Sequence, residues 1–347
     1  MRLSSPNGNF ASTGSCAAAA AAAAAAFWQG VTLPSVVIDL PDSGQVELEI
    51  ERLEKDRTSS LAAVRKPSND DPDATRGLLV CVHLTPCEAG GIRFQAGEGV
   101  GTVTRPGLQL KVGEAAINPV PRRQIMQELA KHGIVHALVE VSIPGGREIA
   151  QRTFNPRLGI EGGLSVLGTA GLVRPFSTQA VIESTRAHLA VARHSGFDRI
   201  CLVPGHMGER AARALLELDD DAIVEVSNAW GEAVDHARSL GFKKLFIVGH
   251  PGKLGKLAQG QWDTHSSHGS TLVPWLRQAA QDWGLTPPMP ANTVDDLFTA
   301  LSLIERAKLA NALAHGVAQA VIRRSGLGCE VLLTDYSGTP LGRTDTP

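Results

Sequence analysis

The chain has 347 residues, with 33 Lys and Arg against 35 Asp and Glu, so its formal net charge is −2. A protein that binds a phosphate backbone normally carries a clear basic excess, so we expect no nucleic-acid partner. A hydrophobic fraction of 43% and a charged fraction of 20% are typical of a globular protein. The length favours two domains over one.

An unbroken alanine run occupies residues 17–26 near the start of the chain. It superficially resembles the apolar core of a signal peptide, but it contains no Leu or Val, and only Arg2 upstream is positively charged. Alanine is the best helix former but is only weakly apolar. We therefore expect a helix of small residues that packs closely against its neighbours. No segment predicts a membrane span.

Cysteine and histidine spacings predict no metal site. The five cysteines are odd in number and contain no CxxC pair, which favours reduced, mostly buried thiols in a cytoplasmic protein. Cys16 has no evident local base and is not expected to be a nucleophile. His265 and His268 are close enough to share a helix face, but a pair without a third ligand favours a packing or capping role. The five are Cys16, Cys81, Cys87, Cys201 and Cys329.

The first half of the chain reads as strands, turns and glycine-rich loops. Two apolar stretches, 36–40 and 46–50, flank a turn and predict a hairpin. Further strands are expected at 78–84 and 135–143, and the glycine-rich stretch 90–113 lies between them. These elements indicate an α+β first domain, residues 1–175.

The second half alternates between strands and helices. That alternation predicts a parallel sheet, and hence a Rossmann-like α/β second domain at 176–347 with a helical C-terminal part. The fold class is thus α/β and α+β, in two domains. The expected helices are 178–194, 209–216, 232–240 and most of 294–324, and the expected strands are 199–203, 222–226, 244–248 and 330–333.

The turn Gly205-His206-Met207-Gly208 follows a predicted strand and precedes a predicted helix. Helix N-terminal amides favour anionic or polar groups, and glycine allows a ligand to approach the backbone. Glu225 lies near the end of the next strand, where an acidic residue often holds ribose hydroxyls. An ordinary glycine turn and a surface glutamate remain the alternatives.

Residues 249–256, Gly-His-Pro-Gly-Lys-Leu-Gly-Lys, look like a phosphate loop. They do not form a Walker A motif, because His250 replaces a glycine and Leu257 replaces the Ser or Thr, so a nucleotide-dependent enzyme loses its best support. A structural turn and a binding loop remain open. The segment 97–102 fails the dinucleotide fingerprint at Thr102, and we expect no strong strand before it.

Positive charge is concentrated between residues 91 and 176. This stretch contains ten basic residues, eight of them Arg, against six Glu and no Asp. Arginine suits bidentate recognition of carboxylates, so a ligand with several carboxylates would explain the bias. A solvated basic face explains it equally well.

Several long, glycine-punctuated motifs resemble those of one family. They include Ser12-Thr13-Gly14-Ser15-Cys16 with its alanines, the stretch 97–108, Asn118-Pro119-Val120-Pro121-Arg122, and the stretch 153–163 that opens Thr-Phe-Asn-Pro-Arg. Residues 203–205, 248–253 and 264–266 fit as well. In this order they resemble the cobalt-precorrin-5B C1-methyltransferases, the CbiD family. Asn9-Phe10-Ala11 and His206 depart from the family pattern, which affects fine substrate contacts more than the family itself.

The resemblance implies transfer of a methyl group from S-adenosylmethionine to C1 of cobalt-precorrin-5B, giving cobalt-precorrin-6A in anaerobic cobalamin biosynthesis. The cobalt belongs to the corrinoid substrate, so the protein needs no metal ligands. His250 is the candidate general base. The expected S-adenosylmethionine contacts are Gly205, Gly208, Gly249, Gly252 and Lys253. The expected corrinoid contacts are Thr13, Gly14, Gly99, Gly101, Arg105, Arg122, Asn155, Arg157 and Arg174.

A non-catalytic corrinoid carrier is the main alternative function. A carrier would keep the first-domain arginines but would not need the second-domain glycines, and both sets are present. A homo-oligomer is compatible with the sequence.

Overall fold

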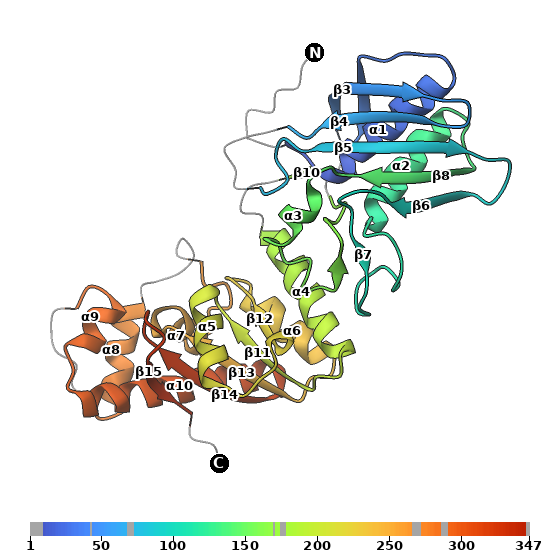
Figure 1. The fold of residues 1–347 in the computed structure, drawn as a ribbon. Coiled ribbons are helices and arrows are strands. Elements are labelled where there is room, and N and C mark those ends of the chain that lie inside the picture. Colours follow the sequence, from blue (N-terminus) through green and yellow to red (C-terminus); the bar gives the residue numbers. More distant parts are fainter. Residues whose placement is uncertain are drawn as a thin grey trace. The chain divides into compact units, whose positions relative to one another are not determined.

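A computed structural model describes residues 10–41, 44–67, 73–168, 171–173, 178–265, 272–285 and 291–344. The chain forms two units, Met1–Ser177 and Thr178–Pro347, and each combines helices with β-sheet (Figure 1). The mixed α/β character expected from the sequence is thus confirmed.

The first unit is built on a six-stranded sheet with the order β2-β3-β4-β5-β8-β6. Neighbouring strands are antiparallel, except that β6 runs parallel to β8. The predicted hairpin is confirmed, because Val36 pairs with Leu48 and Ile38 with Val46. The strands are β2 (Ser35–Asp39), β3 (Gln45–Lys55), β4 (Ser60–Arg65), β5 (Leu79–Pro86), β6 (Ile92–Ala96) and β8 (Ala137–Ser142).

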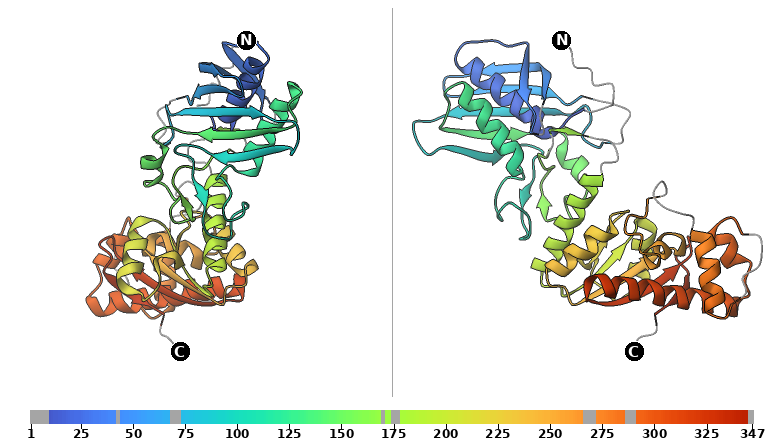
Figure 2. Two further views of the ribbon diagram at one scale, coloured as in Figure 1. Left: turned by 45° about the vertical axis from the view of Figure 1, so that its right-hand side comes forward. Right: turned by 180° about the vertical axis from the view of Figure 1, so that it is seen from behind.

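The alanine run lies in helix α1 (Thr13–Trp28), which packs on one face of this sheet beside α2 (Pro119–Lys131), as the right-hand view of Figure 2 shows. Each of the ten alanines is at most 2% exposed. Methyl side chains allow a helix to approach both a sheet and a second helix closely, and any larger side chain would overpack this core. The prediction of a closely packed small-residue helix is confirmed.

Strand β6 corrects one expectation. No strong strand was expected before Gly97, yet β6 ends at Ala96, directly before it. Its sequence Ile-Arg-Phe-Gln-Ala alternates apolar and polar residues, and its exposure alternates in step. Glycines flank these five residues on both sides, so the segment read as part of a glycine-rich loop although apolar and polar residues alternate within it.

Short elements complete the first unit around the segment 97–101. Strand β7 pairs with β9, and β1 pairs with β10 next to the start of α1. These elements are β1 (Phe10–Ala11), β7 (Thr102–Val103), α3 (Gly146–Ala150), β9 (Ile160–Glu161) and β10 (Leu172–Val173).

The second unit has a five-stranded sheet with the order β12-β11-β13-β14-β15. The first four strands are parallel, as predicted, and β15 is an antiparallel edge. Helix α5 packs on one face, whereas α4, α6, α7 and α10 pack on the other. The strands are β11 (Arg199–Val203), β12 (Ile223–Glu225), β13 (Lys244–Gly249), β14 (Gly328–Thr334) and β15 (Pro340–Arg343). The helices are α4 (Thr178–His194), α5 (His206–Leu215), α6 (Trp230–Ser239), α7 (Pro251–Ala258), α8 (Leu272–Asp282), α9 (Val294–Thr299) and α10 (Leu303–Ser325).

All five cysteines are free, and Cys16, Cys81 and Cys201 are buried. Burial raises the pKa of Cys16 to about 12, so its thiol stays protonated at neutral pH, in agreement with the expectation that it is no nucleophile. Among the described residues, no helix is long and apolar enough to cross a bilayer, and no group of three potential metal ligands is found.

Candidate functional site

The turns after β11 and β13 lie next to each other in the second unit, because these two strands are neighbours in the sheet. The chain runs from β11 outward to β12 and then returns to β13 on the other side of β11. Ligands of open α/β sheets bind at such a point, outside the carboxyl ends of the strands where the order reverses. The predicted turns at Gly205 and Gly249 both occupy this position.

Two of the predicted glycines allow these turns to pack against each other. A Cβ on Gly208 would lie 2.9 Å from the carbonyl oxygen of Val248, and one on Gly249 would lie 2.8 Å from Cγ of Pro204. Both distances are far shorter than ordinary van der Waals contact. Gly208 and Gly249 therefore have a packing role, and their contact with S-adenosylmethionine stays a prediction.

Gly205 is different, because the space that a side chain at this position would occupy is open. Among the described residues other than its two chain neighbours, only Oε1 of Glu225 would lie within 4 Å of an added Cβ, at 3.6 Å. Its φ of 163° and ψ of −173° are extended, so the backbone does not require glycine there. An open glycine between a helix N-terminus and a carboxylate is the feature of this turn that suits a ligand.

His250 begins helix α7 and uses both ring nitrogens in hydrogen bonds. Its Nδ1 accepts a hydrogen bond from the backbone N–H of Gly252 at 3.0 Å, so Nε2 carries the proton and donates to Oδ1 of Asp295 at 2.8 Å. The ring also stacks on Tyr336, with centroids 4.0 Å apart. In this arrangement neither nitrogen is available to take a proton from a substrate, and the geometry favours a capping role.

The predicted phosphate-like loop is instead the first part of α7, so Lys253 and Lys256 project from a helix. Lys256 donates to the carbonyl oxygens of Thr264 and His265 at 3.1 and 3.3 Å. Lys253 is half-buried; desolvation lowers its pKa, and the nearby charge of Glu225 opposes that shift. Lys253 and Glu225 are thus both half-buried and close enough for their charges to interact. A role for Lys253 in cofactor binding stays a prediction.

The loop after β12 contains a residue that the sequence did not single out. Ser227 has a φ of +52°, the only positive value for a non-glycine residue in the described part of the chain. Such a conformation is strained and is enriched at functional sites. The next residue, Asn228, accepts a hydrogen bond from the hydroxyl of Thr264 at 3.3 Å. The polar Ser-Asn pair directly after a strand was the available sequence signal.

In the first unit, the predicted glycines also serve close packing. A Cβ on Gly99, whose φ is +72°, would lie 2.0 Å from the carbonyl oxygen of Ile143. A Cβ on Gly101 would lie 2.5 Å from Cγ2 of Ile160, and one on Gly14 would lie 2.7 Å from Cγ of Pro121. Substrate contact by these glycines stays a prediction, since packing alone explains them.

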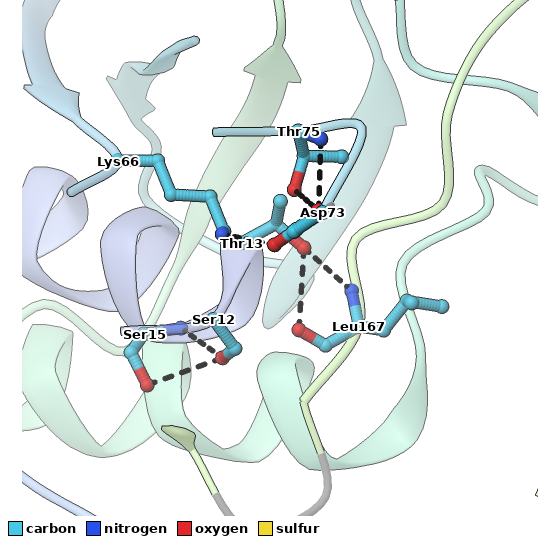
Figure 3. A network of polar contacts seen from close by, with 7 residues as sticks. All are labelled: Ser12, Thr13, Ser15, Lys66, Asp73, Thr75 and Leu167. Carbon is cyan, nitrogen blue, oxygen red and sulfur yellow. Dashed lines mark hydrogen bonds and ion pairs between the residues drawn. The ribbon is translucent and has the colours of Figure 1, made fainter. Parts of the chain in front are cut away.

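Polar contacts hold the start of α1 (Figure 3). The hydroxyl of Thr13 accepts a hydrogen bond from the N–H of Leu167 at 2.9 Å and donates to its carbonyl oxygen at 3.2 Å. The side chain of Ser12 caps the helix by accepting from the N–H of Ser15. Beside these residues, Lys66, which is 2% exposed, forms an ion pair with Asp73. Thr13 therefore ties α1 to the segment around Leu167.

The Lys66–Asp73 pair makes the stability of the first unit depend on pH. Burial alone would raise the pKa of Asp73, but hydrogen bonds from Lys66 and Thr75 outweigh it and lower that pKa below its ordinary value of 3.8. The stabilisation is therefore complete well above pH 3.8 and is lost as the pH falls towards the lower folded-state pKa.

We expect Asp73→Asn to reduce the free energy of unfolding at pH 7 by about 2–3 kcal/mol, because Lys66 loses its partner while buried. Urea denaturation measures this, and the difference from the unsubstituted protein should shrink as the pH falls below 3.8. The matched control is the double variant Lys66→Met, Asp73→Asn, which should recover most of the loss. A pH-independent difference would contradict the ion-pair explanation.

Among the remaining predicted corrinoid contacts, Asn155 and Arg122 are held by the protein itself. The Asn155 side chain donates to the carbonyl oxygen of Gly163 at 3.2 Å and accepts from the hydroxyl of Ser165 at 3.3 Å. Arg122 donates from Nε to the carbonyl oxygen of Ile117 at 2.8 Å. Their roles in substrate binding stay predictions.

The sequence of the chain is similar to that of proteins with known names. The family model described as CbiD matches residues 7–175. A cobalt-precorrin-5B C(1)-methyltransferase of Syntrophotalea carbinolica is 41% identical over 317 residues, which cover 90% of this chain and 89% of that relative. The chain belongs to the CbiD family.

Other members of the CbiD family are similar over slightly shorter stretches. A cobalt-precorrin-5B C(1)-methyltransferase of Pseudomonas fluorescens is 43% identical over 286 residues, covering 80% of this chain and 78% of the relative. A crystal structure of the cobalamin biosynthesis protein CbiD from Archaeoglobus fulgidus matches with 28% sequence identity and a TM-score of 0.40, covering 80% of this chain and 85% of that one.

Three further arginines are predicted from the CbiD resemblance to contact the corrinoid, and the structure describes two of them. Arg105 is half-buried and its stem lies over Gly159, where an added Cβ would meet it at 2.5 Å. Arg157 is also half-buried. Arg174 lies outside the described residues. All three stay predictions of substrate contact in this CbiD family member.

Proposed function

We propose that this chain methylates C1 of cobalt-precorrin-5B and uses S-adenosylmethionine as the methyl donor. The observation that carries the proposal is the 41% identity to a cobalt-precorrin-5B C(1)-methyltransferase over 90% of the chain. A non-catalytic corrinoid carrier is not favoured, since the relatives from Syntrophotalea carbinolica and Pseudomonas fluorescens share the methyltransferase name.

We assign the donor to the second unit, which we regard as a Rossmann-like α/β domain, and the corrinoid to the first, α+β unit. The support for the donor site is the position of Gly205 at the reversal of strand order, with an open side next to Glu225. We assign the ribose hydroxyls of the donor to Glu225 and its polar groups to the N-terminal amides of α5. The buried thiols agree with a cytoplasmic enzyme, which is also our expectation.

S-adenosylmethionine supplies a methyl group on a positively charged sulfur, which is an intrinsically reactive electrophile. The protein's task is therefore to orient the two reactants, and such positioning contributes roughly 7–11 kcal/mol towards lowering a barrier. The close packing of the Gly205 turn on β13, which Gly208 and Gly249 permit, suits this task. No protein metal ligand is needed for this chemistry.

We assign His250 the role of helix cap rather than that of general base. We expect His250→Asn to keep kcat within about threefold of the unsubstituted enzyme, because asparagine also caps helices, whereas loss of a general base costs about 10²–10⁴-fold. Steady-state methyl transfer measures this. His250→Ala, which removes the cap, should lower the unfolding free energy by about 1 kcal/mol. A folded His250→Asn variant that loses kcat more than a hundredfold would restore the base assignment.

The direct test combines the purified chain with cobalt-precorrin-5B and S-adenosylmethionine carrying a labelled methyl group. Mass spectrometry should find one labelled methyl on the corrinoid and S-adenosylhomocysteine as the second product. Corrinoid binding without methyl transfer would support the carrier function instead. Calorimetric titration with S-adenosylhomocysteine, with and without corrinoid, separates donor binding from catalysis.

A further inference from the structure

The first unit contains a cavity of about 490 Å³ at the edge of its six-stranded sheet. Strand β6 forms one wall, and it is the last strand in the sheet order, so within the described residues no strand pairs with its outer edge. Its lining includes Arg93, Phe94 and Gln95 from β6, together with Thr102, Glu114 and Arg122. The size is within the range of ligand sites in proteins.

One wall of the cavity is a rigidly held positive charge. The Arg122 guanidinium donates to the carbonyl oxygens of Ile117 and Ala115 at 2.8 and 3.1 Å, and its central carbon lies 5.4 Å from the centre of the Phe94 ring. Glu114 lies 3.2 Å from the same guanidinium. These contacts fix the direction of the group and neutralise much of its charge.

The second positive charge of the cavity is not neutralised. Arg93 is exposed on β6, and although its backbone is paired with β8, no described residue forms a hydrogen bond or an ion pair with its side chain. Among the described residues of the lining, Glu114 is the only acidic one, and Arg122 already pairs with it. The cavity therefore has an excess of one positive charge, carried by a planar group with paired donors that match a carboxylate.

We propose that this cavity binds one carboxylate arm of the corrinoid, with Arg93 as the residue that pairs with the carboxylate. Phe94 and the Arg122 guanidinium over its ring lie on the core-facing side of β6, whereas Arg93 projects from the exposed side, because successive side chains of a strand point to opposite faces. The inference rests on the proposed function, since that function supplies a ligand rich in carboxylates, and it names a contact that the motif-based predictions did not include.

The test is calorimetric titration of the full chain with two cobalt corrinoids, dicyanocobyrinic acid, which has free carboxylate arms, and dicyanocobinamide, whose arms are amides. We expect Arg93→Met to weaken binding of cobyrinic acid by about tenfold or more, because one charge-assisted bidentate contact is lost. Binding of cobinamide should change by less than about twofold. Arg93→Lys should give an intermediate loss for cobyrinic acid.

The matched control is Arg57→Met, which removes another exposed arginine of the same unit, outside the cavity lining. It should leave both corrinoid affinities unchanged, and S-adenosylhomocysteine binding should be the same in all variants. Equal affinity of the unsubstituted chain and Arg93→Met for cobyrinic acid would overturn the arm-binding site while leaving the proposed function intact. So would an equal loss for both corrinoids. If the unsubstituted chain binds neither corrinoid, the arm-binding site is overturned, whereas the proposed function is decided separately by methyl transfer to cobalt-precorrin-5B.

Discussion

Gly205→Val should strongly weaken binding of the methyl donor while the protein remains folded. The extended backbone at this position accepts valine, and the nearest described atom to its Cβ, beyond the two chain neighbours, would be Oε1 of Glu225 at 3.6 Å. The added side chain would, however, fill the open space that we assign to S-adenosylmethionine. We expect the affinity for S-adenosylhomocysteine to fall by about 100-fold, or about 2.7 kcal/mol, with a similar fall in kcat/KM. Calorimetry and a methyl-transfer assay measure the two effects.

The matched control for Gly205→Val is Gly328→Val. Gly328 begins strand β14, at the opposite end of the same parallel strands, and an added Cβ would lie 3.7 Å from its nearest neighbour, the carbonyl oxygen of Lys243. The two variants therefore make the same chemical change in similar free space. Unchanged donor affinity in Gly205→Val, with both variants folded, would show that this turn is not the donor site.

Gly99→Ala should strongly destabilise the first unit, although it adds a single methyl group. The residue has a φ of +72°, which costs an L-residue about 1–2 kcal/mol, and the new Cβ would lie 2.0 Å from the carbonyl oxygen of Ile143. Relieving that overlap requires backbone movement, because Gly146 N and the Ile143 carbonyl carbon are both within 2.9 Å. We expect a loss of about 3–5 kcal/mol in the free energy of unfolding, much of the stability of a typical domain.

Gly113→Ala separates the two contributions. Gly113 has a φ of +90° but nothing within 4 Å of an added Cβ, so only the backbone term of about 1–2 kcal/mol should appear. Urea denaturation followed by circular dichroism compares the two variants with the unsubstituted chain. Similar losses in both would mean that the segment around Ile143 moves aside easily, and Gly99 would then need another explanation.

Local patterns in the sequence were sufficient to predict most elements of the fold. The alanine run predicted a closely packed helix because alanine combines high helix propensity with a side chain of one methyl group, and α1 has that form. Alternating strands and helices in the second half predicted a parallel sheet, because each helix returns the chain to the end of the sheet at which the previous strand began. The motif resemblance was sufficient to predict the family.

The function of individual residues depended on distances between segments far apart in the chain. Glycines that look alike in sequence proved different, since Gly205 is open whereas Gly249 lies against Pro204. His250 was the candidate general base from its motif, and only the fold showed that its ring contacts Asp295 and Tyr336, which lie far along the chain. Propensity and motif spacing are properties of neighbouring residues, so they were enough to define the elements, their order and the family. Which glycines pack and which leave room became clear from the folded chain alone, because a close approach exists only after distant segments have come together.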